Sequence, residues 1–144
     1  MATYHFVADT AKSPTEVFEF FADMRNAPTW DPSITSVVRL DDGAVRLGST
    51  FRVALGFVGR SLLLEYVVAN FDVPHRVVLR AESKFFISED TISVAAMAGG
   101  ATRVTYEASL VGKGATVVLD SLFKLSINHF GKRAGAKLRE GYLR

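Results

Sequence analysis

The sequence predicts an α+β fold in which a curved antiparallel sheet packs against one long C-terminal helix. Apolar and polar residues alternate through a series of short segments, which is the period of β-strands. Turn residues separate these segments at short spacing, so neighbouring strands are expected to pair antiparallel in sequence order. Residues 115–143 instead have an extended helical period with one apolar stripe. That stripe comprises Leu119, Phe123, Ile127, Phe130, Ala134 and Leu138.

The first elements are expected to be a strand and a short helix. Residues 4–10 alternate as a strand does. The segment Ser13-Pro14-Thr15-Glu16 supplies a serine N-cap, a proline in the first helical turn and a glutamate that closes a capping box. This helix should end before Pro28, because a residue that precedes proline is pushed out of the helical region. Residues 26–32 then form a turn or a short second helix that contains the only tryptophan, Trp30.

A meander of strands follows, separated by Gly, Pro and Asp turns. The expected strands are 34–40, 50–57, 62–70, 76–83, 86–96 and 102–111. Such a sheet has one apolar face, and the C-terminal helix has the surface to cover it. We expect the first half of that helix to be firmly packed. Its second half contains Gly131 and Gly135, and we expect a looser wall there, where the cavity would open.

The composition limits the class of protein. The 144 residues fit one domain, so residues 1–144 are expected to form a single domain with a substantial core. The net charge of +2 is too small to indicate nucleic-acid binding. The apolar runs are too short for a membrane span and the N-terminus does not resemble a signal peptide, so we expect a cytoplasmic protein without integral membrane association. The chain lacks cysteine and its three histidines have no ligand-like spacing, so neither a metal nor a cofactor is expected.

Several stretches carry a family resemblance. Residues 13–23 (SPTEVFEFFAD) and the following turn 26–32 resemble the first helix and turn of the START-like, helix-grip superfamily (SRPBCC). Residues 90–94 and 100–108 resemble its last hairpin, and residues 74–79 fit its central turn. This superfamily is often labelled polyketide cyclase/dehydrase and lipid transport. The resemblance covers essentially the whole chain, and its motifs specify the fold better than the function.

The resemblance implies a seven-stranded antiparallel sheet curled around the C-terminal helix, with two short helices after the first strand and an apolar cavity in between. Members bind sterols, other lipids, plant hormones, aromatic polyketides or quinones, and some are cyclases or hydrolases. We therefore expect binding of a hydrophobic small molecule, lipid-like or polycyclic, for transport or sequestration. No shared catalytic set is implied, so the catalytic residues stay unknown and binding is favoured over enzyme activity. We expect a monomer or a weak homodimer.

Strand alternation indicates which side chains face the helix, but periodicity alone does not distinguish a filled core from a pocket lining. The resemblance favours a pocket, because small-molecule sites are mostly apolar cavities with a few polar groups. The candidate lining residues are Trp30, Phe51, Val53, Leu55, Phe57, Leu64, Tyr66, Val68, Leu79, Asp90, Ile92, Val94, Tyr106, Phe123, Ile127 and Phe130. The expected cavity mouth, on one flank of the helix, consists of Ser126, His129 and Arg133. The alternative, that these three are solvated helix-edge residues, is the commoner case for such positions.

Three lining candidates are polar. Asp90 continues an apolar strand face, where a carboxylate must be paired, hydrogen-bonded or neutralised; near a strand end it would instead reach water. Tyr66 and Tyr106 each bring a hydroxyl group to the apolar face, where it needs a partner or a ligand oxygen. Either tyrosine would also fit a filled core.

Two other functions stay open. A cyclase, dehydratase or hydrolase would use acid and base groups that converge on one space. The candidates for these groups are Asp90, Tyr66, Tyr106 and His129. A protein-interaction module would instead expose apolar side chains on the outer face of the strands. The candidates for that surface are Leu63, Val67 and Val78.

Overall fold

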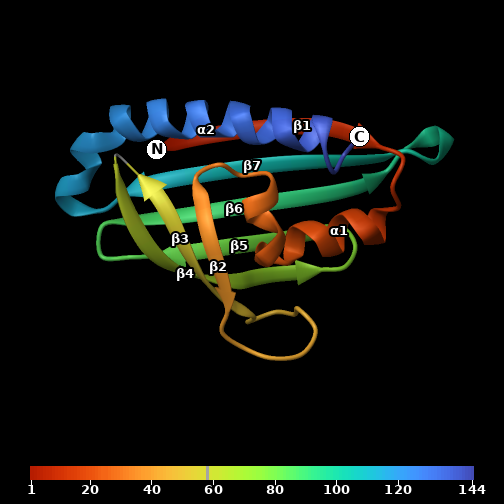
Figure 1. Cartoon of the computed structure of the whole chain (residues 1–144), viewed down its shortest axis with the longest axis horizontal. Coiled ribbons are helices and arrows are strands. Elements are labelled where there is room, and N and C mark those ends of the chain that lie inside the picture. Colours follow the sequence, from red (N-terminus) through yellow and green to blue (C-terminus); the bar gives the residue numbers. More distant parts are fainter. Residues whose placement is uncertain (58) are drawn as a thin grey trace.

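The structure is a computed structural model that describes residues 1–57 and 59–144. Among these residues, seven strands form a curved antiparallel sheet in the order β1-β7-β6-β5-β4-β3-β2 (Figure 1). The strands are β1 (Ala2–Thr10), β2 (Ile34–Arg39), β3 (Thr50–Phe57), β4 (Arg60–Asp72), β5 (Arg76–Glu82), β6 (Phe86–Ala96) and β7 (Thr102–Gly112). The predicted α+β helix-grip fold is therefore confirmed, with strand boundaries close to those expected from the sequence.

The meander from β2 to β7 pairs in sequence order, as short turns require. The first strand does not follow this rule, because β1 lies beside β7 in a register that runs from Ala2 opposite Leu110 to Thr10 opposite Thr102. Strands β1 and β2 consequently lie at opposite edges of the sheet. The chain crosses between them through α1 (Pro14–Ala22) and the 3-10 helix η1 (Met24–Thr29) (Figure 1).

The start of α1 has the predicted cap. The Glu16 amide donates to the Ser13 hydroxyl oxygen at 3.2 Å, and Pro14 occupies the first turn. The segment after α1, expected as a turn or short helix, is the 3-10 helix η1, and Asp23 caps it by accepting from the Arg25 amide at 3.1 Å. These two helices thus turn Trp30 back toward the sheet.

The C-terminal helical segment differs from the prediction in its first half. It begins with a 3-10 turn, η3 (Gly114–Leu119), and continues as α2 (Asp120–Glu140). The expectation of a firmly packed first half was wrong, because Val118 is 83% exposed and Leu125 is 71% exposed. The physical reason is position: α2 packs mainly along β1 at the sheet edge, so only the narrow stripe containing Phe123 turns inward.

The second half of α2 packs closely against β1. A Cβ atom added at Gly131 would lie 2.4 Å from Cγ of Tyr4, and one at Gly135 would lie 2.9 Å from Cδ2 of Phe6. Helix and strand can approach this closely only because both positions lack a side chain. The expected loose wall at these glycines was therefore wrong.

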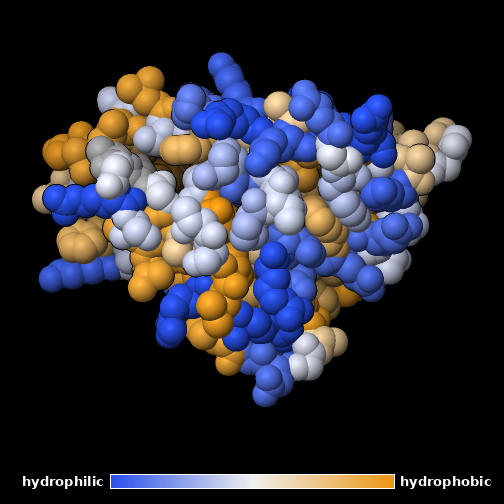
Figure 2. All heavy atoms as spheres, in the orientation of Figure 1, coloured by the Kyte–Doolittle hydropathy of each residue, from blue (hydrophilic) through white to orange (hydrophobic). Residues whose placement is uncertain are grey.

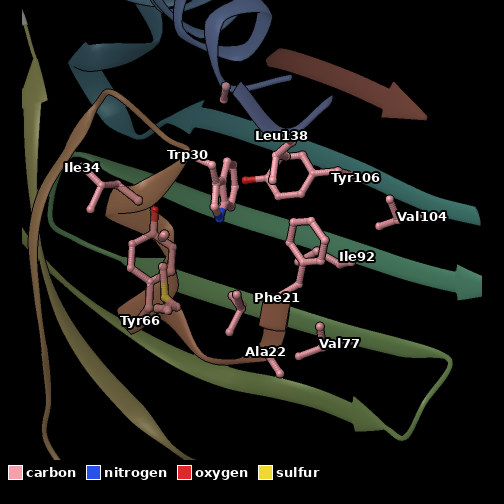
Figure 3. Close-up of a cluster of buried hydrophobic side chains, with 14 of the residues drawn as sticks. Phe21, Ala22, Trp30, Ile34, Tyr66, Val77, Ile92, Val104, Tyr106 and Leu138 are labelled. Carbon is pink, nitrogen blue, oxygen red and sulfur yellow. The ribbon is translucent and has the colours of Figure 1, made fainter. Parts of the chain in front are cut away.

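Beneath α1 and η1, aromatic side chains fill the core. Phe18 packs edge-to-face on Phe71 with ring centroids 5.2 Å apart, and Phe21 packs similarly on Trp30 at 5.7 Å. Trp30 in turn contacts Tyr106 at 5.5 Å (Figure 3). These aromatic rings fill one end of the concave face, and the other end is covered by α2. None of the helices in the described ranges is both long and apolar enough to cross a membrane.

Candidate ligand-binding site

A cavity of about 140 Å³ lies between the sheet and α2, partly open to solvent. Its wall is mostly apolar, and aromatic side chains form much of it. The rings belong to Tyr4, Phe6, Trp30, Tyr66, Phe86, Tyr106, Phe123 and Phe130. An engineered apolar cavity of about 150 Å³ is enough to hold benzene. The space is therefore sufficient for an aromatic ring, and its open side allows a longer molecule to extend outward.

The cavity exists because small side chains face one another where α1 no longer covers the sheet. Ala108 on β7 and Ala134 and Gly135 on α2 all border the space. At the other end of the sheet, the aromatic residues of α1 fill the corresponding space. Small residues on β7 and α2, two elements that are distant in the sequence, thus border the same cavity.

Polar groups from three strands and one turn gather on the cavity wall. The hydroxyl groups of Tyr66 on β4 and Ser88 on β6 are hydrogen-bonded to each other at 2.8 Å. The Tyr106 hydroxyl on β7 donates a hydrogen bond to the carboxyl group of Asp90 on β6. Tyr66 and Tyr106 both extend from the sheet into the interior (Figure 3). A ligand in this cavity would therefore meet hydroxyl and carboxyl groups along one side.

A second carboxyl group reaches the same wall from the turn after η1. Asp31 Oδ1 accepts from the Ser33 amide at 2.9 Å and from the Ser33 hydroxyl at 2.6 Å. This compact turn directs both residues toward the cavity, which they help to line. Asp31 and Asp90 are close enough for the charge of Asp31 to act on Asp90.

Burial controls the protonation of these groups. It raises the pKa of Asp90 to about 7, an effect that the Tyr106 hydrogen bond opposes and that the charges of Asp31 and Glu89 increase. Burial likewise raises the pKa of Asp31, against the two Ser33 hydrogen bonds. It also raises the pKa of Tyr66 and that of Tyr106 above the usual value, so both phenols stay protonated at neutral pH. Asp90 can therefore exchange a proton near pH 7.

The structure brings about half of the sequence-predicted lining residues to the cavity. Those on its wall are Trp30, Leu55, Tyr66, Asp90, Tyr106, Phe123, Ile127 and Phe130. Seven others are buried in the core and do not border this cavity: Phe51, Val53, Leu64, Val68, Leu79, Ile92 and Val94. They face the same side of the sheet, but α1 and η1 fill the space above much of it. The side chain of Phe57 lies outside the described residues.

Of the three residues predicted for the cavity mouth, the structure places one at the cavity. Ser126 borders the cavity, whereas His129 and Arg133 are exposed on α2 and form no part of the wall. The stripe of α2 that faces the cavity runs through Ile127, Phe130 and Ala134, and the two basic positions are rotated away from it. Among the acid and base candidates, Asp90, Tyr66 and Tyr106 thus share one space and His129 does not.

Sequence reasoning missed the polar turn residues Asp31 and Ser33. Alternation places residues only inside regular strands and helices, so it gave no orientation for a turn. A signal was available, since Asp31 follows the anchoring Trp30 and precedes Pro32 in a segment expected to pack on the core. Within residues 1–57 and 59–144, no group of three His, Asp or Glu side chains is arranged to hold a metal ion.

The outer face of the sheet is less apolar than expected. Leu63 is 70% exposed and Val67 is half-buried, but Val78 is buried, so its prediction as a surface residue was wrong. Val78 lies on the central strand β5, where Asn70 and Thr91 flank it on the two neighbouring strands. Leu63 and Val67 therefore remain as the candidates for a protein-contact surface on this face.

This arrangement, a curved antiparallel sheet that holds a C-terminal helix over an apolar cavity, defines the helix-grip class. The profile of the family described as "Polyketide cyclase / dehydrase and lipid transport" matches residues 1–137. The chain belongs to this family. A comparison with curated proteins gives no match.

Solved structures share the fold at low sequence identity. A START superfamily protein from Mycobacterium smegmatis is similar with a TM-score of 0.70 and 14% identity, over 97% of this chain and 99% of the other. The Zhui aromatase/cyclase from Streptomyces sp. R1128 is similar with a TM-score of 0.72 and 12% identity, over 98% of this chain and 90% of the other. At such identities the likeness concerns the fold alone.

Proposed function

We propose that residues 1–144 act as one binding domain whose cavity takes a hydrophobic small molecule, lipid-like or polycyclic. The observation that carries this proposal is the mostly apolar, ring-lined cavity of about 140 Å³ between the sheet and α2. Ligand sites in proteins have this composition, with a few polar groups that fix orientation. The family description, which names polyketides and lipid transport, agrees with an apolar ligand.

The expected affinity follows from the apolar area removed from water. Burying about 200–300 Å² of ligand surface at about 25 cal/mol per Å² supplies several kcal/mol before ordering costs. A dissociation constant in the micromolar range corresponds to about 8 kcal/mol. One or two hydrogen bonds to the polar wall would orient the ligand. Binding of this strength suits reversible transport or sequestration.

The test is a titration with N-phenyl-1-naphthylamine, an uncharged dye that fluoresces in apolar surroundings. We expect saturable binding to the wild-type protein and at least about tenfold weaker binding to Ser126→Phe, which places a ring in the cavity wall. The matched control is Ser121→Phe, on the same helix but exposed, which should bind normally. Absence of saturable binding, or equal weakening in both variants, would contradict the proposal.

A second candidate is proton transfer at the cavity, as in a cyclase or dehydratase. The observation that favours it is the hydrogen-bonded pair of Asp90 and Tyr106 on the cavity wall, together with the pKa of about 7 for Asp90. A general base is most effective when its pKa lies near the working pH. Ionised Asp90 would remove a proton next to a ligand carbonyl, whose oxygen would accept a hydrogen bond from a wall hydroxyl.

This candidate is tested by deuterium exchange of 2-tetralone, a small aromatic ketone with acidic protons beside its carbonyl group. NMR in D₂O would follow the loss of those proton signals. An enzyme of this type should accelerate exchange above the buffer rate, and Asp90→Asn should remove the acceleration. The exposed variant Asp72→Asn serves as control. Equal rates for wild type, Asp90→Asn and buffer would eliminate this candidate for ketones of this kind.

A further inference from the structure

We infer that the ligand presents a hydrogen-bond donor, an O–H or N–H group, to the polar side of the cavity, and that carboxylate ligands of the same shape are rejected. This inference rests on the proposed function and specifies the chemistry of its ligand. It separates hydroxylated or amine-bearing apolar molecules from fatty acids and other carboxylates. The argument comes from the balance of donors, acceptors and charges on the cavity wall.

The wall has an excess of acceptors. Two carboxyl groups, those of Asp31 and Asp90, border the cavity. An ionised carboxylate offers about four acceptor sites. Both hydrogen bonds to Asp31 fall on Oδ1, and among the described residues Asp90 receives its hydrogen bond from Tyr106. Lone pairs therefore remain on both carboxyl groups for a donor that a ligand supplies.

Four hydroxyl groups of the wall, those of Ser33, Tyr66, Ser88 and Tyr106, already take part in hydrogen bonds with other groups of the wall. The Tyr66 hydroxyl is bonded to Ser88, the Tyr106 hydroxyl donates to Asp90, and the Ser33 hydroxyl donates to Asp31. A ligand that only accepts hydrogen bonds leaves both carboxyl groups without a new donor, and it would have to break a contact to accept from the Tyr106 or Ser33 hydroxyl. Leaving a buried polar group without its partner costs about 1–3 kcal/mol. A ligand that donates makes new bonds and breaks none.

The charges on the wall also disfavour an anion. Within the described residues, no lysine, arginine or histidine borders the cavity. Lys137 on α2 is the cation whose charge reaches Asp31, and its side chain is exposed outside the wall. Glu89 adds negative charge beside Asp90. A carboxylate ligand would thus lose its hydration and gain no cationic partner, while like charges in a region of low dielectric repel strongly.

The experiment ranks four compounds that share one apolar body and differ in the polar group. They are 2-naphthalenemethanol, 2-naphthylmethylamine, 2-naphthoate and 2-methylnaphthalene, each used to displace N-phenyl-1-naphthylamine from the wild-type protein at pH 8. We expect the alcohol and the amine to displace the dye at concentrations at least about tenfold lower than naphthoate, a factor equal to 1.4 kcal/mol. Methylnaphthalene should fall between them.

Variants then assign the discrimination to the carboxyl groups. Asp31→Asn and Asp90→Asn each replace a charge with an amide that can donate, so each should reduce the preference for alcohol over naphthoate to about threefold or less. The exposed Asp72→Asn is the matched control and should keep the preference. The wild-type ranking tests the inference even if a variant fails to fold.

The outcomes separate this inference from the proposed function. Naphthoate binding as tightly as the alcohol, or more tightly, would overturn the inference and leave hydrophobic binding intact. If neither the dye nor any of the four compounds binds, the proposed function fails and the inference with it. A preference for the alcohol that all three Asn variants retain would overturn the assignment to Asp31 and Asp90.

Discussion

At the residue scale, Asp90 is a buried carboxyl group that costs stability when it is ionised. Its carboxyl group lies on a strand face that is otherwise apolar, and the Tyr106 hydroxyl is its hydrogen-bond donor. A carboxyl group at this position destabilises the fold when ionised, because burial disfavours charge. Such a group is typical of a site whose protonation or hydrogen bonding serves a ligand. The residue-scale consequence is a pH dependence of stability.

We predict that Asp90 lowers stability as the pH rises from about 4 to about 7. The pKa of Asp90 is about 7 in the folded protein, against an ordinary value of 3.8. Between these two values the folded state retains a proton that the unfolded state has released, so the free energy of unfolding falls as pH increases. Below this window both states are protonated, and above it both are ionised, so the contribution is constant on either side.

Urea unfolding at pH 4, 5, 6, 7 and 8 measures this effect. The difference in unfolding free energy between wild type and Asp90→Asn should change by about 1 kcal/mol per pH unit inside the window, with the wild type losing stability at higher pH. Asp42→Asn removes an exposed carboxyl group and is the control. A difference that stays flat from pH 4 to pH 7 would show that the pKa of Asp90 is not raised.

At the scale of elements, the two halves of α2 differ in how closely they pack against the sheet. The second half is held against β1, where Arg139 donates to the Val7 carbonyl at 3.0 Å and its guanidinium group lies 4.5 Å from the Phe6 ring centroid. Both halves border the cavity, but several apolar side chains of the first half are exposed. Figure 2 shows hydrophobic atoms gathered at the end of the molecule where Figure 1 places η3 and the start of α2. The helix is thus anchored by its second half and packed more loosely in its first half.

We predict that Gly131→Ala destabilises the protein, although alanine is the better helix former. Its methyl group would lie 2.4 Å from the Tyr4 ring, and overpacking of this kind typically costs about 1–3 kcal/mol. The helix propensity gain of about 1 kcal/mol offsets this only in part. Thermal or urea unfolding should show a net loss. Combining the change with Tyr4→Ala should cost less than the sum of the two single changes, because the clash is removed.

Ser121→Ala on the exposed side of the same helix is the control for Gly131→Ala. It should change the free energy of unfolding by less than about 0.5 kcal/mol. An unchanged or increased stability for Gly131→Ala would mean that α2 can move away from β1 without cost. In that case the anchored half of the helix would not be the second half.

For the whole molecule, the sequence predicted the architecture well. Alternation placed every strand, and the serine cap at Ser13 and the stripe at Phe123 located the helices correctly. These signals are local, and each follows from the geometry of one strand or helix. The pairing of β1 with β7 is not local, and no pattern in the sequence predicted it. The exposure of Leu125 was missed because a helical wheel does not show where the sheet ends.

The candidate site was harder to predict than the fold. Periodicity correctly assigned Tyr66, Asp90 and Tyr106 to the inner face. It did not reveal that α1 and η1 would fill the space above residues such as Phe51, since that depends on how an entire helix packs. It also did not predict the orientation of Asp31, which reaches the cavity from an irregular turn. The volume and the polarity of a cavity arise from packing between distant elements, which local patterns do not encode.

The difference in burial between the two halves of α2 leads to a prediction for the motion of the protein. Regions with few buried apolar contacts open at low free energy, and their amides exchange with solvent faster. Residues 120–128 contain one fully buried side chain, Phe123, whereas Ala134, Gly135 and Leu138 are all buried in the second half. We therefore expect amide hydrogen exchange to be faster in 120–128 than in 131–138. Ligand entry would then require movement of the first half of α2, while the sheet and the second half stay fixed.

Hydrogen exchange with and without saturating N-phenyl-1-naphthylamine measures this difference. A ligand that contacts Phe123 and Ile127 in the closed state should slow exchange in 120–128, by up to about a hundredfold at a free concentration of 100 times the dissociation constant, because opening is coupled to release. Exchange in 131–138 should change little. Faster exchange in 131–138, or protection confined to that half, would place the moving part of the helix at the glycines. The second half would then not be the anchored one.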